Sequence, residues 1–253
     1  MYGLGIDSGS TTTKGVLVGE GVIVETFITP TSASPRDSIY EVYKRLCSDS
    51  VGFTVTTGYG RELLTESDKK VTEITCHAKG AAFLNPHIRA VIDIGGQDCK
   101  AISLDKDLNV SDFVMNDKCA AGTGRFVEVM MRTLGENIDG LDSFVSGRTP
   151  VNISSMCTVF AESEIVSLLA KGTPKGDIAL GIIHSICRRT AFFAQKVHIE
   201  GDVFFSGGLA RFAVFRDTLE KYLEHRVVTD SMSQYAGAIG AGVIAYKKAV
   251  AAI

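Results

Sequence analysis

Two acidic, glycine-containing turns, each placed directly after an apolar segment, constrain the fold of this chain more than any other feature. The first turn, Asp7–Lys14, follows the apolar residues 2–6, and the second, Asp93–Asp98, begins at the end of the apolar segment 90–94. Each turn leads into two further apolar segments and then into helical patterns. Strands and helices mixed in this repeated order predict an α/β protein built from two related lobes.

Apolar periodicity and turn residues predict the elements of both halves. In the first half we expect strands at 2–6, 15–18, 22–28 and 51–57, a helix that opens at Pro35, and a helix at about 76–84. In the second half we expect strands at 90–94, 100–104, 110–115, 203–206 and 226–229. Helices are expected there at about 122–134, 159–171 and 174–197, and from Tyr235. No low-complexity or Pro-rich linker separates the two halves.

The charge balance excludes some classes of function. The chain has 253 residues, with 26 Lys and Arg against 29 Asp and Glu, and no Trp. A basic face and stacking aromatic side chains are typical of nucleic-acid binders, so we expect no nucleic-acid partner. The longest small-apolar run, 236–246, is too short to span ~30 Å of hydrocarbon, and Asp7 interrupts any apolar leader segment. We therefore expect a cytoplasmic protein that does not enter a membrane.

The first turn has the residues of a phosphate-binding loop. Glycine allows a tight backbone turn, so amide and hydroxyl groups can converge on phosphate oxygens. The hydroxyls come from four consecutive residues, Ser10, Thr11, Thr12 and Thr13. Lys14 would neutralise phosphate charge, and Asp7 would hold Mg²⁺ through water, because hard cations prefer oxygen ligands. The alternative is a polar β-hairpin turn with no ligand.

The second acidic turn repeats this device. Its residues placed to meet phosphate are Gly95, Gly96 and Gln97. By analogy with glutamines that orient the attacking water in other NTPases, Gln97 is also a candidate catalytic residue.

Two further glycine elements follow. The pair Gly207 and Gly208, with Leu209, follows an apolar segment and opens a helix, which suits a nucleoside. A last cluster, Gly237–Gly242, lies in the closing helix, where glycine is costly, so we expect close helix packing at a hinge. The Walker pattern G-x-x-x-x-G-K-[ST] is absent. Four glycine elements in this order are a much more specific signal of a nucleotide site than any one of them.

On these elements the chain resembles the actin-like ATPase superfamily of sugar kinases, acetate kinase, actin and ATPase chaperones. The resemblance is carried by four segments, Asp7–Lys14, Asp93–Asp98, Gly207–Ala210 and Ala236–Gly242. It implies a two-lobed, ribonuclease H-like α/β fold with mixed sheets flanked by helices, and MgATP in the cleft between the lobes. Residues 1–70 would form the first lobe, completed by 237–253, and residues 71–236 the second. Asp7 and Asp93 would be the two catalytic carboxylates that face the metal.

Two of the six cysteines lie in unusual surroundings. Cys119 and Cys157 each precede an expected helix, in a polar turn rich in glycine or serine. A thiolate at a helix N-terminus is stabilised by the helix dipole and by free N–H donors. Two thiolates are too few for a four-ligand site in one chain, but a twofold dimer supplies four, which suits one 4Fe–4S cluster. A cysteine can instead act as a small hydrophobic residue in the core, and this is how we interpret Cys47, Cys99 and Cys187.

The phrases NDKCAAGTGRF, SSMCTVFAESE, VTEITCHAKGA and TGYGR give a narrower resemblance, which runs over essentially the whole chain. They are similar to the ATP-dependent activators of 2-hydroxyacyl-CoA dehydratases, which are grouped with benzoyl-CoA reductase ATPase subunits. The resemblance implies a homodimer bridged by one 4Fe–4S cluster, held by Cys119 and Cys157 of each subunit. ATP hydrolysis would drive a low-potential electron, received from a donor such as ferredoxin or flavodoxin, into an iron–sulfur dehydratase or reductase. Cys99 has no place in that pattern and receives no role.

Two other functions stay open at this point. A small-molecule kinase of the same fold would need a substrate pocket with a base beside it, and an actin-like or chaperone-like ATPase would carry no redox centre. His77 has no second metal ligand at i+3 or i+4, so we expect a capping or packing role for it. Glu162 opens a helix, where an acidic residue is favourable without further function. We expect Phe192 and Phe193 in the core.

Overall fold

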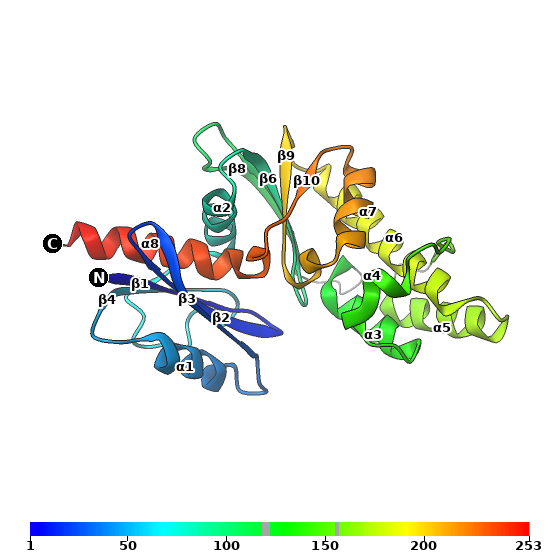
Figure 1. Ribbon diagram of the computed structural model, residues 1–253, viewed down its shortest axis with the longest axis horizontal. Coiled ribbons are helices and arrows are strands. Elements are labelled where there is room, and N and C mark those ends of the chain that lie inside the picture. The colour runs from blue at the N-terminus through cyan, green and yellow to red at the C-terminus, as the bar shows by residue number, and fades with distance from the viewer. Residues whose placement is uncertain (118–121, 155–156, 253) are drawn as a thin grey trace.

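The computed structural model describes residues 1–117, 122–154 and 157–252. These residues form two five-stranded sheets with helices packed around them, as Figure 1 shows. The first sheet comprises β1 (Tyr2–Ser8), β2 (Thr12–Gly19), β3 (Val22–Pro30), β4 (Val51–Thr57) and β5 (Lys69–Lys70). The second comprises β6 (Ile88–Ile94), β7 (Cys99–Leu104), β8 (Val110–Asn116), β9 (Asp202–Ser206) and β10 (Val227–Val228). The predicted two-lobed α/β fold is confirmed.

The two sheets share one topology. The strand order is β3-β2-β1-β4-β5 in the first sheet and, read in the matching direction, β8-β7-β6-β9-β10 in the second. Each sheet is an antiparallel three-stranded meander extended by two parallel strands. In both sheets an aspartate near the end of the central strand, β1 or β6, pairs in register with a lysine of the next strand along the chain. The pairs are Asp7 with Lys14 and Asp93 with Lys100.

The first sheet is covered by α1 (Pro35–Leu46), which begins at the predicted proline. Proline is favoured in the first turn of a helix because its missing N–H has no intrahelical partner there. Ile39 and Val42 of α1 are fully buried, together with Leu4 and Ile6 of β1, in one apolar cluster. Burial of this apolar face fixes α1 on the sheet and leaves the ends of β1 and β2 free to form the site.

The second lobe carries most of the helices and the largest core. They are α3 (Gly124–Thr133), α4 (Leu141–Phe144), α5 (Thr158–Ala170), α6 (Lys175–Ala194) and α7 (Ala213–Leu223). Phe126, Ile182 and Phe215, from α3, α6 and α7, are all completely buried in that core. Phe193 packs against it as expected, whereas our expectation for Phe192 is wrong, because its side chain is 71% exposed.

Two helices cross between the sheets, α2 (Glu73–Leu84) and α8 (Ala236–Ala251), and Figure 1 shows α8 lying along the first sheet. A Cβ added to Gly240 of α8 would lie 1.8 Å from the carbonyl oxygen of Cys76, and one added to Gly80 of α2 would lie 1.8 Å from that of Ala236. Only glycine permits this approach of the two backbones. The expected close packing of the last helix is therefore confirmed. Within the described ranges, no helix combines the length and apolarity needed to cross a membrane.

Candidate functional site

The ends of β1 and β6 face each other across a cavity of about 360 Å³, which residues of both lobes line. Most of the predicted site residues line this cavity: Asp7, Ser10, Thr11, Thr12, Lys14, Asp93, Gly95, Gly96, Gln97, Gly207, Gly208 and Leu209. Thr13 does not line it; this residue is buried, and its hydroxyl oxygen lies 2.9 Å from that of Thr31. The structure thus brings three glycine loops, separated by up to 200 residues of chain, to one place.

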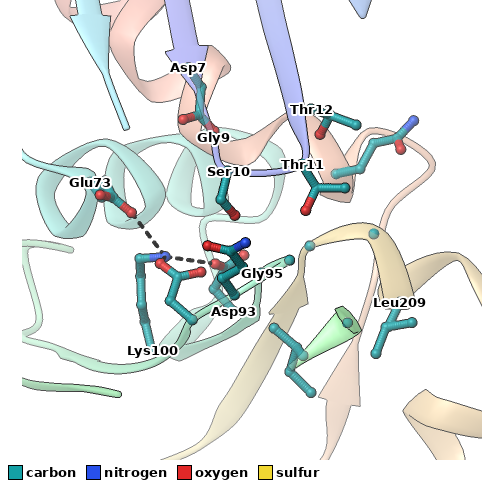
Figure 2. Close-up of a pocket in the computed structure, with 18 of the residues that line it drawn as sticks. Asp7, Gly9, Ser10, Thr11, Thr12, Glu73, Asp93, Gly95, Lys100 and Leu209 are labelled. Carbon is teal, nitrogen blue, oxygen red and sulfur yellow. Dashed lines mark hydrogen bonds and ion pairs between the residues drawn. The ribbon is translucent and has the colours of Figure 1, made fainter. Parts of the chain in front are cut away.

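The first loop joins β1 to β2 and is fixed by its own backbone. The amide of Gly9 donates to the carbonyl oxygen of Thr12 at 3.2 Å, and the hydroxyl of Thr31 donates to the carbonyl oxygen of Gly9 at 2.8 Å. Because the backbone is held in this way, the hydroxyls of Ser10 and Thr11 are free to face the cavity, as Figure 2 shows. This arrangement suits the binding of phosphate oxygens.

The second loop joins β6 to β7 and is held by the start of α3. The amide of Gly124 donates to the carbonyl oxygen of Gly95 at 2.8 Å, and that of Arg125 donates to Gly96 at 2.9 Å. The first amides of a helix have no intrahelical acceptor, so these bonds satisfy them. Any movement of the second loop therefore reaches α3 directly.

His77 of α2 lies between the two predicted carboxylates. Its Nε2 is 4.0 Å from Oδ2 of Asp7, and its Nδ1 is 3.4 Å from Oδ1 of Asp93. The imidazole is buried, as a packing residue would be, but it sits in the second turn of α2 and so does not cap that helix. Sequence reasoning missed its position between the lobes, because only the crossing of α2 brings it there.

Asp93 is held as a carboxylate. Burial alone would raise its pKa, but the neighbouring His77 and Lys100 and a 2.7 Å hydrogen bond from the hydroxyl of Ser206 outweigh burial. The pKa of Asp93 therefore lies well below its usual range, and the group is ionised at neutral pH. A buried carboxylate at the end of each central strand gives the cavity the oxygen ligands that a magnesium ion prefers.

Lys100 and Glu73 are further members of the site that sequence reasoning missed. Both line the cavity, and Glu73 Oε2 lies 3.0 Å from Lys100 Nζ (Figure 2). One signal for Lys100 was present in the sequence, since it follows Asp93 at the same spacing at which Lys14 follows Asp7. No comparable pattern pointed to Glu73.

The third loop forms the opposite end of the cavity. Gly207 adopts a φ of +95°, and a Cβ there would lie 2.1 Å from the carbonyl oxygen of Ile94, so glycine is required. Beyond it, Arg211 lies over the ring of Phe212 at 4.6 Å and pairs with Asp139 at 2.8 Å. Flat guanidinium and aromatic groups at the wall of a cavity suit a planar base.

The described cysteines differ in their exposure, and Cys47, which we expected to be buried, is only half-buried. Cys157 is exposed and occupies the N-cap of α5, whereas Cys119 lies outside the described residues. Burial raises the pKa of the Cys76 and Cys99 thiols to about 12, so both are protonated at neutral pH. Cys187 is buried in the same way. Across the described ranges, no group of three or more His, Cys, Asp or Glu side chains is arranged to hold a metal ion.

Comparison with known proteins gives consistent matches along the chain. It is 50% identical over 245 residues to YjiL, an uncharacterised protein of Escherichia coli (strain K12), with 96% of each chain covered. It is 43% identical over 258 residues to the (R)-2-hydroxyglutaryl-CoA dehydratase activating ATPase of Acidaminococcus fermentans, with 98% of each chain covered.

A solved structure gives the same assignment. The activator of the 2-hydroxyisocaproyl-CoA dehydratase from Clostridium difficile, with bound ADPNP, superimposes with a TM-score of 0.92 at 35% identity, covering 100% of this chain and 97% of that one. Residues 4–245 match the family described as the BadF/BadG/BcrA/BcrD ATPase family. With near-complete coverage of relatives at this identity, the chain belongs to the BadF/BadG/BcrA/BcrD ATPase family.

Proposed function

We propose that the chain is the ATP-hydrolysing activator of an iron–sulfur enzyme, which delivers a low-potential electron to a 2-hydroxyacyl-CoA dehydratase or a related reductase. The observation that carries this proposal is that Asp7 and Asp93, from the two lobes, line one cavity together with three glycine loops. The relatives named as dehydratase activators support the choice of partner. An electron donor such as ferredoxin or flavodoxin and a cytoplasmic location complete the proposal.

In this proposal the phosphates lie between the first two loops. Ser10, Thr11, Thr12 and the amides of Gly95 and Gly96 would hold their oxygens, Thr13 would support the loop from beneath, and Lys14 would neutralise charge. The third loop, Gly207–Leu209, would hold the nucleoside. Figure 2 shows Ser10, Thr11, Gly95 and Leu209 around one space, with Asp7 and Asp93 on the side away from Leu209. The lobes 1–70 with 237–253, and 71–236, would close on the nucleotide.

The donor set fits magnesium. Mg²⁺ keeps several waters and takes one or two carboxylates together with phosphate oxygens, so the pair Asp7 and Asp93 suffices without a cage of protein ligands. When bound, the ion would neutralise charge that develops on the phosphates. Gln97 lines the cavity and would orient the attacking water. That water forms a bond to the γ-phosphorus as the bond to the β-phosphate oxygen breaks, which yields ADP and phosphate.

The surroundings of Cys157 fit an anionic iron–sulfur cluster. Its thiol is exposed at the N-cap of α5, where unpaired amides and the helix dipole stabilise negative charge. Cys157 and Cys119 from each subunit of a homodimer would supply the four thiolates of one 4Fe–4S cluster. When bound, the cluster would supply a one-electron donor.

The exposed face of α5 supports the homodimer. Val159 and Phe160 follow Cys157 in the first turn of α5 and are each 68% exposed, and Val166, about two turns beyond Val159, is 53% exposed. Such apolar side chains are unfavourable in water, and contact with a second copy around the cluster would bury them.

Anaerobic purification tests the proposed function against its two rivals. We expect a brown dimer with about four iron atoms and an ATPase activity that accelerates when an iron–sulfur partner is present. A colourless protein that transfers phosphate to a small molecule would favour the kinase. A colourless ATPase that transfers none would favour the actin-like or chaperone-like alternative.

A further inference from the structure

Lys100 is a buried lysine in the middle of a site built from acidic residues. It is 1% exposed and lies on β7, in register between Asp93 of β6 and Met115 of β8. Lysine is almost never fully buried without partners, because removal of its ammonium from water is costly. Its counterpart in the first lobe, Lys14, is only half-buried. The burial of Lys100 therefore requires a specific explanation.

Three carboxylates from three different segments surround its ammonium. Nζ lies 3.0 Å from Oε2 of Glu73 on α2, 3.2 Å from Oδ2 of Asp93 on β6, and within hydrogen-bond distance of Oδ2 of Asp98 in the second loop. Three carboxylates at this distance compensate the ammonium for its removal from water.

Three carboxylate oxygens converge on Nζ, and the ammonium is the positive charge that lies between them. The single charge of the ammonium leaves the group of four with a net charge of −2. Asp93 thus directs Oδ2 at Lys100 and Oδ1 at His77 and Ser206.

We propose that Lys100 is a positioning residue for ATP hydrolysis, whose ammonium takes the place of a second divalent cation among Glu73, Asp93 and Asp98. In this place it fixes the orientation of Asp93 and ties the second loop, through Glu73, to α2. The inference deepens the proposed ATPase function and rests on it for its kinetic part. Its metal-binding part concerns the protein without nucleotide and is independent of that function.

The test compares Lys100→Met with a matched control, Lys79→Met. Lys79 lies on α2, the helix that carries Glu73, but its ammonium bonds only to Oδ1 of Asn109, at 2.8 Å, among the contacts between described residues. Electron paramagnetic resonance counts bound Mn²⁺ in the nucleotide-free protein. We expect Lys100→Met to bind one more Mn²⁺ per chain than the wild type, and Lys79→Met to bind no more than the wild type.

Kinetics supply the second readout. In Lys100→Met we expect kcat to fall about 100-fold, the size of effect expected when a catalytic group is misplaced by about 1 Å, with a much smaller change in KM for ATP. Millimolar free Mg²⁺ should restore part of that kcat, because the divalent ion replaces the ammonium. A purely structural role for Lys100 would produce neither the extra Mn²⁺ nor the dependence on free Mg²⁺.

Three uncompensated carboxylates could prevent Lys100→Met from folding, and a second variant covers that case. Glu73→Gln combined with Lys100→Met removes one charge of each sign, and it should fold, bind no extra Mn²⁺ and keep the low kcat. Wild-type kcat in either folded variant, or a low kcat in Lys100→Met without the extra Mn²⁺, would overturn the inference. If the wild type itself hydrolyses no ATP, the proposed function fails, and the Mn²⁺ count still decides the role of Lys100.

Discussion

Gly96 and Thr11 touch across the cleft: a Cβ built on Gly96 would lie 1.9 Å from Oγ1 of Thr11. Gly96 belongs to the second lobe and Thr11 to the first, so the two loops meet at this contact. The absence of a side chain at position 96 thus allows the two loops to come this close.

Gly96→Ala should therefore hold the lobes apart. The added methyl group must displace Thr11 or the second loop, and we expect KM for ATP to rise about tenfold, or about 1.4 kcal/mol of binding free energy. Gly140→Ala is the control, because its Cβ would meet only Oγ of Ser143, at 3.8 Å. An unchanged KM in Gly96→Ala would show that the lobes do not close at this contact.

Replacement of the proposed cluster ligands should remove iron. Cys119→Ser or Cys157→Ser takes two of four thiolates from a cluster on a twofold axis, so we expect loss of iron and of visible absorption. Cys47→Ser should change neither, because that cysteine is half-buried beside α1. Full iron content in either of the first two variants would contradict the ligand assignment.

Asp7→Ala tests whether MgATP turnover can be lost while iron is retained. The carboxylate lies in the cavity, far in sequence from both proposed ligands, and we expect MgATP turnover to fall by at least about 100-fold while iron content is retained. Anaerobic ATPase assays with iron determination on the same sample make the measurement. Simultaneous loss of iron would mean that Asp7 supports the fold.

The buried thiols predict a loss of stability in alkali. Cys76 and Cys99 have folded-state pKa values of about 12, above their ordinary value of 9.0. A raised folded-state pKa contributes stability below the ordinary value, and that contribution is lost as the pH rises from 9 towards 12. Urea unfolding at pH 8 and pH 10.5 should show a smaller decline for Cys76→Ala/Cys99→Ala than for the wild type. Equal declines would show that these thiols do not contribute.

Much of the fold was predictable because short stretches of sequence determine its strands and turns. Apolar runs bounded by glycine or polar turns predicted every long strand, and the repeated aspartate–glycine turns predicted two related lobes. The site loops were predictable for the same reason, since Asp7–Lys14 and Asp93–Asp98 carry glycine and polar side chains in consecutive positions.

The remainder depends on contacts that no local pattern shows. Glu73 and His77 enter the site only because α2 crosses α8 at a glycine contact and then faces both loops. Lys100 violates the usual exposure of lysine, and its burial follows from three carboxylates of separate segments. Phe192 and Phe193 are neighbours on a helix, about 100° apart around its axis, so only one of them faces the core.

A short path of contacts links the cavity to the segments that carry the proposed cluster ligands. Amides of Gly124 and Arg125 hold the second loop, and Gly124 follows Cys119 by only five residues. Further along α3, the hydroxyl of Thr133 donates to Glu162, in the second turn of the helix that begins after Cys157. Closure of the lobes on ATP would thus move both segments that carry the proposed ligands.

The rate at which a chelator removes iron tests this coupling most directly. It is measured anaerobically on the wild-type protein with no nucleotide, with ADP and with a non-hydrolysable ATP analogue. Lobe closure that depends on the γ-phosphate predicts three different rates, with the ATP analogue and ADP clearly separated. Identical rates in all three states would contradict the account, because ATP hydrolysis would then be unconnected to the cluster.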